Sequence, residues 1–251
     1  MFPIFPNNAR GAVSLTYDDA TPDHLDAAMV DLESTGLRGT FFIPTRTAGA
    51  SFLDRAEAWR DAALRGHEIG NHTQYHPCAA GPDWVKPNFS LEAYSLSRME
   101  AELSTANRDL DAFAGAAAQR SFAYPCCQSY VGPDQTSYRP MAARLFPACR
   151  GGAGRKLVDP FDCDFAFVPA WVIRHDTPLE QVLQFIDDAV EDGRWAVLVF
   201  HSIGGRGPLA IPRATHQSIV EYVAAPRAQV WCETFLKVAQ HIREATHRPW
   251  P

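Results

Sequence analysis

The chain has 251 residues, and 46% of them are hydrophobic, which is enough to bury the core of one large domain. Its net charge is −6 and it has no run of Lys or Arg, so nucleic acid and an anionic membrane surface are not expected partners. No stretch reaches the ~18 apolar residues of a membrane helix. The first ten residues lack the apolar segment of a secretory signal. As written, the sequence predicts a cytoplasmic protein, or a secreted or periplasmic one if a leader has been removed.

The cysteines are dispersed. The chain has six of them, and only Cys126 and Cys127 are neighbours. Because no Cys-x-x-Cys pair occurs, the pattern indicates neither a zinc knuckle nor a dense disulfide framework. Cys126 is expected to be a packed thiol or one half of a single bridge, with Cys78 as a candidate partner.

Short apolar runs alternate with helix-like patterns along the chain. The expected strands cover residues 11–17, 40–43, 67–71, 121–124, 148–150, 165–168, 195–200 and 229–231. The expected helices cover residues 22–35, 52–64, 90–110, 134–146, 179–190, 214–223 and 233–244. About eight strands, each followed by a helix or a long loop, predict an α/β fold whose parallel sheet closes into a barrel. No repeat or linker interrupts the pattern, so residues 1–251 are expected to form a single domain.

Polar side chains follow several of these strands at their carboxyl ends. In parallel barrels, functional residues gather where strands end and loops begin. The residues at such positions are Asp18, Asp19, His72, His76, Tyr124, Pro125 and His201. Four independent groups on one face of the barrel indicate a metal-dependent hydrolase.

His72 and His76 lie four residues apart, a spacing that can aim both imidazoles at one point. Imidazole suits Zn²⁺ and its neighbours among the divalent ions, and a third ligand would leave a position open for water. Asp19 is the expected third ligand. Zn²⁺ is the first choice of metal, with Co²⁺, Mn²⁺ or Ni²⁺ as alternatives. The same ligand set also occurs in non-haem iron oxygenases, and the two histidines could instead be ordinary loop residues.

The remaining polar groups suggest acid and base roles. Asp18 and Asp19 point to opposite sides of the strand end, so Asp18 can act as a general base. Alternatively, the acidic pair caps the helix that follows. His201 ends a wholly apolar strand and can donate a proton to a leaving group, or it can be a half-buried histidine bonded to a carbonyl. The backbone N–H of Cys126 is expected to help stabilise an oxyanion.

Four motifs, in this order, resemble the polysaccharide deacetylase group, the NodB homology or carbohydrate esterase family 4. They are Leu15-Thr16-Tyr17-Asp18-Asp19-Ala20, His72-Thr73-Gln74-Tyr75-His76-Pro77, Phe122-Ala123-Tyr124-Pro125 and Leu198-Val199-Phe200-His201. The resemblance runs from about residue 11 to residue 245. It implies a distorted (β/α) barrel of seven to eight strands and a metal-dependent hydrolysis of acetyl groups from sugars. By this resemblance the metal ligands are Asp19, His72 and His76, the base is Asp18, the acid is His201, and the backbone oxyanion contact is Cys126.

The sequence departs from the family pattern in three places. Ala20 stands where the first motif usually has Gly. The third motif commonly carries an Arg that braces the base, but Ala123 occupies that position and Arg120 lies three residues earlier. The fourth motif has no clean copy; Trp171 is the candidate for its pocket wall and Asp176 for its orienting carboxylate. Tyr124 and Pro125 complete the expected substrate-binding residues.

The expected function is the removal of N- or O-acetyl groups from a carbohydrate of the chitooligosaccharide, peptidoglycan or acetylxylan type. The expected partner is an acetylated saccharide, and the oligomeric state stays open. One alternative is a catalytically inactive carbohydrate-binding homologue. Another is an amidohydrolase that acts on a small non-sugar amide. Four aromatic residues in the loops could stack on sugar rings or serve packing alone: Trp84, Phe89, Tyr130 and Tyr138.

Overall fold

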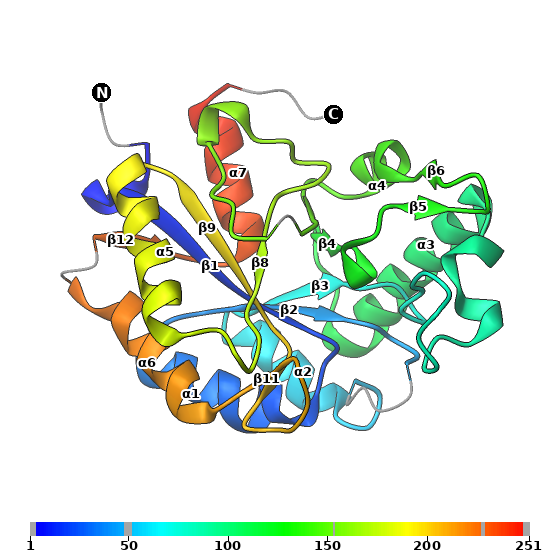
Figure 1. Ribbon diagram of the computed structural model, residues 1–251, viewed down its shortest axis with the longest axis horizontal. Helices are drawn as coiled ribbons and strands as arrows, with labels where there is room; N and C mark the ends of the chain where they lie inside the picture. Colours follow the sequence, from blue (N-terminus) through cyan, green and yellow to red (C-terminus); the bar gives the residue numbers. More distant parts are fainter. Residues whose placement is uncertain (1–3, 48–51, 153, 227–228, 248–251) are drawn as a thin grey trace.

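The apolar strand β9 (Trp195–Phe200) lies between β1 (Gly11–Asp18) and β8 (Trp171–Val172), and all three run parallel (Figure 1). Every residue of β1 and β9 is buried, which explains why β9 is apolar throughout instead of alternating; in β1, the buried Ser14, Thr16 and Asp18 alternate with apolar residues. The computed structural model describes residues 4–47, 52–152, 154–226 and 229–247.

The main sheet has eight strands in the part of the chain that the structure describes. Its order is β7-β4-β3-β2-β1-β9-β8, and β12 also pairs with β1. The other strands of this sheet are β2 (Thr40–Ile43), β3 (Glu68–Asn71), β4 (Phe122–Ala123), β7 (Cys149–Arg150) and β12 (Val230–Cys232). An isolated parallel bridge joins Arg150 of β7 to Val168, shortly before β8, so this segment approaches both edges of the sheet. The sheet is therefore curled into a distorted (β/α) barrel, as the sequence predicts.

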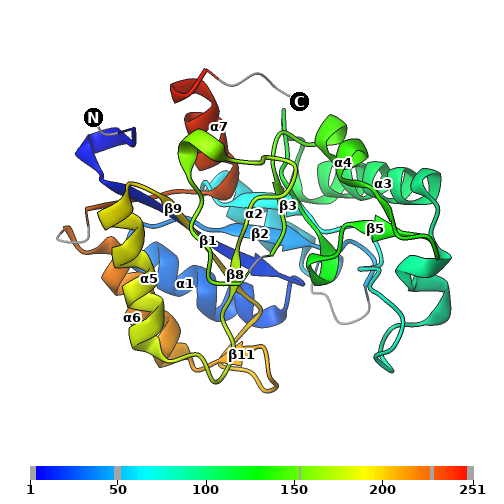
Figure 2. The same ribbon diagram turned by 45° about the horizontal axis from the view of Figure 1, so that its top comes forward.

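Helices cover the outside of the sheet. They are α1 (Met29–Ser34), α2 (Ala56–Leu64), α3 (Leu96–Ala114), α4 (Arg139–Leu145), α5 (Leu179–Asp192), α6 (Arg213–Ala224) and α7 (Phe235–Ala245). Figures 1 and 2 show α1, α5 and α6 on one flank of the sheet and α3 and α4 on the other. Among the described residues, no helix is both long and apolar enough to cross a membrane.

Two small strand pairs extend the loops. β5 (Tyr130–Val131) pairs antiparallel with β6 (Thr136–Ser137), and β10 (Ser202–Ile203) pairs parallel with β11 (Ala210–Ile211). Since β10 begins directly after His201, the second pair shapes the loop at the carboxyl end of β9.

The helix expected over residues 134–146 begins at Arg139, because Thr136 and Ser137 form β6 and pair with β5. Two further expected elements also differ in the structure. The long helix starts at Leu96 because Ser95, rather than Ser90, accepts a hydrogen bond from the N–H of Arg98 and caps it. Residues 165–168 do not form a strand; Val168 contributes one bridge, and the strand that pairs with β9 is β8. Both differences leave the parallel order of the long strands unchanged.

Candidate metal centre and active site

Asp19, His72 and His76 come together at the carboxyl ends of β1 and β3. The Nε2 atom of His76 lies 3.3 Å from Asp19 Oδ1, and that of His72 lies 3.7 Å from the same oxygen. One potential ligand atom from each residue lies within 4.8 Å of the other two. The three side chains predicted as metal ligands therefore share one centre.

His72 presents a free lone pair to this centre. Its Nδ1–H donates to the carbonyl oxygen of Ala123 at 2.8 Å, which leaves Nε2 as the unprotonated nitrogen of the neutral ring. Burial lowers the pKa of His72 to about 4, despite the nearby carboxylates that oppose this shift. The buried Nε2 has no hydrogen-bond partner. A neutral imidazole with an unused buried nitrogen is the form that binds a metal.

The loop that carries His76 is held by polar groups beneath it. Thr73 and His76 both have positive φ angles, of 67° and 53°, so the chain turns tightly between the two histidines. The N–H of His76 donates to Thr73 Oγ1, and the N–H of Thr73 donates to the buried Asn71 side chain. Glu102 of α3 accepts the N–H groups of the two intervening residues. These bonds fix the backbone of the loop that carries the second imidazole.

Asp19 is ionised in this environment. Its burial favours the neutral acid, but His76, His201 and His72 together hold the pKa of Asp19 below its usual value. The residue adopts a φ of 79°, which is unusual for a non-glycine residue and turns its carboxylate toward the imidazoles.

This donor set fits a divalent metal ion of the zinc type. It combines two imidazole nitrogens with one carboxylate and leaves space for further ligands on the cavity side. A second group of metal-ligand types, made of His76, Cys78 and Cys126, does not fit. The two sulfur atoms of that group are joined in a disulfide and are unavailable as thiolates.

Asp18 is paired with an arginine that the sequence did not identify. The Nη2 atom of Arg150, on β7, donates to Asp18 Oδ2 at 2.6 Å, and both side chains are buried. The other oxygen of Asp18 has no hydrogen-bond partner. A carboxylate that is anchored through one oxygen keeps the second oxygen free to take a proton.

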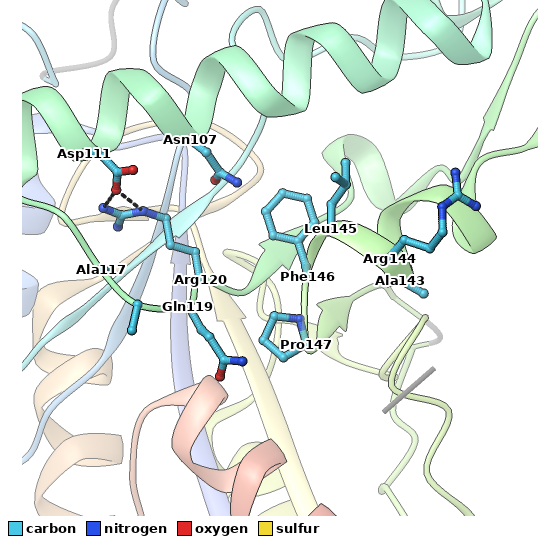
Figure 3. Close-up of a pocket in the computed structure, with 11 residues that line it drawn as sticks. Asn107, Asp111, Ala117, Gln119, Arg120, Ala143, Arg144, Leu145, Phe146 and Pro147 are labelled. Atoms are coloured by element: carbon cyan, nitrogen blue, oxygen red, sulfur yellow. Dashed lines mark hydrogen bonds and ion pairs between the residues drawn. The ribbon is translucent and has the colours of Figure 1, made fainter. Parts of the chain in front are cut away.

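Arg120, the arginine nearest to the expected motif position, does not reach Asp18. It pairs with Asp111 at 2.7 Å, in a cavity between the end of α3 and the segment after α4 (Figure 3). The guanidinium also donates to the carbonyl of Ile69. Arg120 therefore has a structural role, and Arg150 holds the position of the missing arginine.

His201 faces the same centre from β9. Its Nε2 lies 4.0 Å from Asp19 Oδ2, and its buried Nδ1 has no hydrogen-bond partner. The ring of the buried His24 donates through Nε2 to the carbonyl oxygen of His201 and fixes the backbone there. Asp176, the suggested orienting carboxylate, is exposed and lies beside Arg174 and His175 instead.

Cys126 reaches the site as half of a disulfide. It is bonded to Cys78, the suggested partner, and the bridge ties the loop after β3 to the turn after β4. Cys126 has a φ of 52°, and in the same turn Cys127 and Gln128 donate their N–H groups to Tyr124 and Pro125. Cys127 keeps a free thiol.

These groups line a cavity of about 600 Å³. The lining residues are Asp18, Asp19, Thr21, Thr47, His76, Trp84, Cys126, Cys127, Val172, Arg174, His201 and Leu209. Its volume is in the range of sites that bind small molecules or single sugar units.

The cavity is not lined by the predicted substrate-binding residues Tyr124, Pro125 and Trp171. Tyr124 is buried and its hydroxyl donates to the carbonyl of Ala166. Trp171 packs edge-on against Phe185 of α5. Since side chains alternate along a strand, the next residue of β8, Val172, lines the cavity instead.

The curled parallel sheet with this cluster at its carboxyl end has the fold of the NodB-type deacetylases. A family model described as polysaccharide deacetylase matches residues 6–132, about half of the chain. The chain belongs to this family. The matched segment includes Asp18, Asp19, His72 and His76, whereas Arg150 and His201 lie beyond it.

Solved structures with the same fold have different activities. One is a protein of Mycobacterium smegmatis assigned to the polysaccharide deacetylases; it is 17% identical, with 98% of this chain and 95% of that chain covered and a TM-score of 0.64. Puue allantoinase is 14% identical; the match covers 99% of this chain and 95% of the allantoinase chain, with a TM-score of 0.64. A family 4 acetyl xylan esterase from Clostridium thermocellum, solved with a cobalt ion, is 16% identical, with 95% and 93% covered and a TM-score of 0.56. At these identities the likeness shows the fold alone. No curated protein sequence is significantly similar to the chain.

Proposed function

We propose that the protein is a metal-dependent hydrolase that removes acetyl groups from a carbohydrate. The observation that carries the proposal is the convergence of an Asp-His-His group, an anchored Asp and a further His on one cavity. Residues 11–245 would act as one catalytic domain. Membership in the polysaccharide deacetylase family supports an acetylated saccharide as the substrate.

Asp19, His72 and His76 would hold one divalent ion, with Zn²⁺ as the first choice and Co²⁺, Mn²⁺ or Ni²⁺ as alternatives. When bound, such an ion supplies Lewis acidity toward an acetyl carbonyl and makes water a better nucleophile near neutral pH. The protein's part is to hold the three ligands in place, and the burial of His72 keeps that imidazole neutral by lowering its pKa.

Asp18 acts as the general base. Arg150 binds one carboxylate oxygen and orients the group, so the other oxygen can accept the proton of the attacking water. His201, whose Nε2 lies 4.0 Å from Asp19 Oδ2, donates a proton to the departing amine or alcohol. The base thus comes from the end of β1 and the acid from the loop that follows β9.

The backbone N–H of Cys126 contributes to stabilising the oxyanion. The disulfide to Cys78 fixes the turn in which this N–H lies, and Cys126 lines the same cavity as Asp18. A donor that is already in place when charge develops needs no reorganisation during the reaction.

The test is acetate release from a panel of N-acetylated and O-acetylated saccharides, covering chitooligosaccharide, peptidoglycan and acetylxylan types. The protein is measured as purified, after chelation, and after addition of Zn²⁺ or Co²⁺. Acetate release that chelation abolishes and metal restores supports the proposal. Saccharide binding without acetate release under all three conditions contradicts it and favours the non-catalytic alternative.

A second candidate is the hydrolysis of a small non-sugar amide. Val172 and Leu209 give the cavity an apolar wall, and its volume of about 600 Å³ suits a compact ligand. The fold shared with an allantoinase is compatible with this use. Hydrolysis of allantoin or another small cyclic amide, without acetate release from any saccharide, would favour this candidate.

A further inference from the structure

The ring of His201 has no hydrogen-bond partner among the described residues. Its Nδ1 atom is buried and unpaired, and its Nε2 atom lies 4.0 Å from Asp19 Oδ2, beyond hydrogen-bond distance. Asp176, the carboxylate expected to orient this ring, is exposed and lies beside Arg174. Since proton donation in a reaction requires a closely defined geometry, the position of the ring depends on its packing and on the backbone that carries it.

Asp23 holds the backbone directly after His201. Its Oδ1 accepts the N–H of Ile203 at 3.1 Å, and its Oδ2 accepts the hydroxyl of Ser202 at 2.6 Å. The Thr21 hydroxyl donates to Oδ1 of the same carboxylate at 2.7 Å. Hydrogen bonds to an ionised acceptor are among the stronger ones, so three of them leave the Asp23 carboxylate and the segment after His201 little freedom to move.

His24, the next residue, holds His201 itself. Its buried ring donates through Nε2 to the carbonyl oxygen of His201, because a carbonyl oxygen can only accept. The ring lies edge-on to that of Tyr17, with centroids 5.6 Å apart, and its centroid is 5.8 Å from that of Phe41. Core packing therefore fixes the donor, and the donor fixes the backbone of the acid.

Asp23 does not serve the helical segment that it precedes. It stands at the N-cap of a π-helical segment, His24–Ala28, yet its side chain makes no capping hydrogen bond there. An aspartate at this position usually accepts an N–H of its own helix. The carboxylate instead bonds two residues that lie 179 and 180 positions further along the chain. Because π-helical turns are rare and frequently occur at functional sites, this choice of partners points to a role in the site.

The loop after β9 closes tightly over the same contact at Gly205. A Cβ atom at this position would collide with Ser202 Oγ and would lie 3.5 Å from Asp23 Oδ2. Any larger residue at position 205 would therefore push Ser202 away from Asp23. The close approach indicates that the loop is built around the bond between these two side chains.

We propose that Asp23 and His24, here called the clamp, are the positioning residues of the acid His201. They hold this histidine through its backbone, in place of a carboxylate bonded to its ring. Neither clamp residue lines the cavity, so both act through His201 and not on the substrate. This inference rests on the proposed function, because it assigns to His201 the donation of a proton to the leaving group.

The experiment compares two substrates that differ in their need for an acid. One is whichever acetylated saccharide or small amide the wild type hydrolyses, whose alcohol or amine leaves only with a proton. The other is 4-nitrophenyl acetate, whose phenolate leaves without one. The zinc-loaded variants Asp23→Ala, His24→Ala, Gly205→Ala and His201→Ala are measured on both, after subtraction of the rate of the chelated protein.

We expect Asp23→Ala to lower kcat on the first substrate by about 10- to 10²-fold and to leave KM and the rate on 4-nitrophenyl acetate near the wild-type values. His24→Ala and Gly205→Ala should act in the same direction. His201→Ala should show the same selectivity with a larger loss. A merely structural role of the clamp would lower both rates together, and that result overturns the proposal.

The double variant Asp23→Ala/His201→Ala decides independently of the ester. If the clamp acts only through His201, the double variant should be no slower than His201→Ala alone. Losses that multiply in the double variant overturn the proposal.

Conservative variants should restore the first rate. Asp23→Asn keeps an acceptor for the Ile203 N–H, and His24→Gln can present an N–H to the same carbonyl. Asp159→Ala is the matched control and should match the wild type on both substrates. Asp159 likewise accepts a backbone N–H, that of Phe161, but it follows Val158, which pairs with Trp195 at the amino end of β9.

Failure of the proposed function gives a different result. If the wild type hydrolyses no saccharide or amide, the imidazole resonances are recorded by NMR, and those of His201 are identified by their absence from the spectrum of His201→Ala. Resonances of His201 that shift or broaden in Asp23→Ala but not in Asp159→Ala support the clamp without the reaction. Unchanged His201 resonances in Asp23→Ala overturn it.

Discussion

Two polar clusters of the protein differ in how fully the hydrogen bonds of their buried groups are satisfied. The Asp31 cluster, on the flank formed by α1 and α6, consists of Tyr17, Asp31, Arg213, His216 and Gln217. Asp31 accepts from Arg213 at 2.8 Å, from Gln217 at 3.1 Å and from His216 at 2.9 Å. The other nitrogen of His216 bonds the Tyr17 hydroxyl at 2.8 Å.

The candidate active site has the opposite property. Among the described residues, the buried side-chain atoms without a hydrogen-bond partner are Asp18 Oδ1, His24 Nδ1, Trp59 Nε1, His72 Nε2, Arg150 Nε, Arg150 Nη1 and His201 Nδ1. All except the Trp59 atom belong to residues in or directly behind the site. Buried polar groups are normally paired, so a concentration of unpaired groups marks a place that is built for a ligand.

This contrast separates stability from function. Burial disfavours the charge of Asp31, yet His216, Arg213 and Gln217 hold its pKa well below the usual value, so the cluster favours the folded state. The site gains no such stabilisation from its free atoms and depends on the surrounding structure to hold them. Substitutions of the unpaired groups of the site should therefore lower activity more than stability, and substitutions in the Asp31 cluster should lower stability more than activity.

The largest effect on activity is expected from Asp18→Asn. This change removes the base while keeping the shape of the side chain, so kcat should fall by about 10²- to 10⁴-fold. The metal content should stay at the wild-type value because Asp18 is not one of the three proposed ligands. Measured by acetate release and by metal analysis, residual activity near that of the wild type would contradict the role of Asp18.

Arg150→Gln should affect both properties. Loss of the 2.6 Å bond lets the base move, and a small misplacement can lower kcat by up to about 10²-fold. The variant also leaves Asp18 as a buried carboxylate without its partner, which should lower the free energy of unfolding by about 3–5 kcal/mol. Activity and denaturant unfolding are measured together. Partial recovery in Arg150→Lys is expected, and wild-type values for Arg150→Gln in both assays would contradict the pairing.

Asp31→Asn should change stability alone. It replaces a charged acceptor of several hydrogen bonds with a neutral group, so the free energy of unfolding should fall by about 1–3 kcal/mol. Below the denaturation temperature, the kcat of the folded protein should match that of the wild type. A large loss of kcat with unchanged stability would break the distinction between the two clusters.

The smallest effect near neutral pH concerns His67, at the amino end of β3. Burial lowers its pKa to about 4, and its Nδ1 accepts the N–H of Gly39 at 3.1 Å, a bond that protonation would break. Because the pKa in the folded state is below the ordinary value of about 6.5, neutral His67 contributes to the free energy of unfolding above pH ~6.5. This contribution to stability is lost as the pH falls toward ~4. We expect the free energy of unfolding to fall by about 1 kcal/mol by pH ~6 and by about 3 kcal/mol by pH ~4 because of this histidine.

The matched variant is His67→Asn, which keeps an acceptor near Nδ1 but does not titrate in this range. Denaturant unfolding of both proteins across this pH window isolates the histidine contribution from that of other groups. If the free energy of unfolding of the two proteins changed with pH in the same way, the proposed contribution of His67 would be contradicted.

The sequence predicts the long strands and the metal-ligand group because both depend on local patterns. β9 is a continuous apolar run, and His72 and His76 follow β3 within a single short loop. Since parallel strands align their carboxyl ends, placing polar residues after strands was enough to group them.

The arginine that pairs with Asp18 and the residues of the cavity wall depend on tertiary contacts, which local sequence patterns do not reveal. Arg150 lies on a two-residue strand, and its partner Asp18 is 132 positions away in the chain. Trp171 is the expected residue of the pocket wall, but its neighbour Val172 lines the cavity. A shift of one residue along a strand moves a side chain to the opposite face of the sheet. An Arg at the end of a short expected strand was the available signal, and the burial of its side chain could not be known from the sequence.

The most direct test of the central claim is calorimetric titration of chelated protein with Zn²⁺, followed by acetate release from the acetylated saccharide panel. The account predicts one ion bound per chain and restored activity in the wild type, and loss of both in His76→Ala, which removes one ligand of the Asp19, His72 and His76 group. Full metal stoichiometry in His76→Ala, or equal acetate release by the chelated and the zinc-loaded wild type, would contradict it.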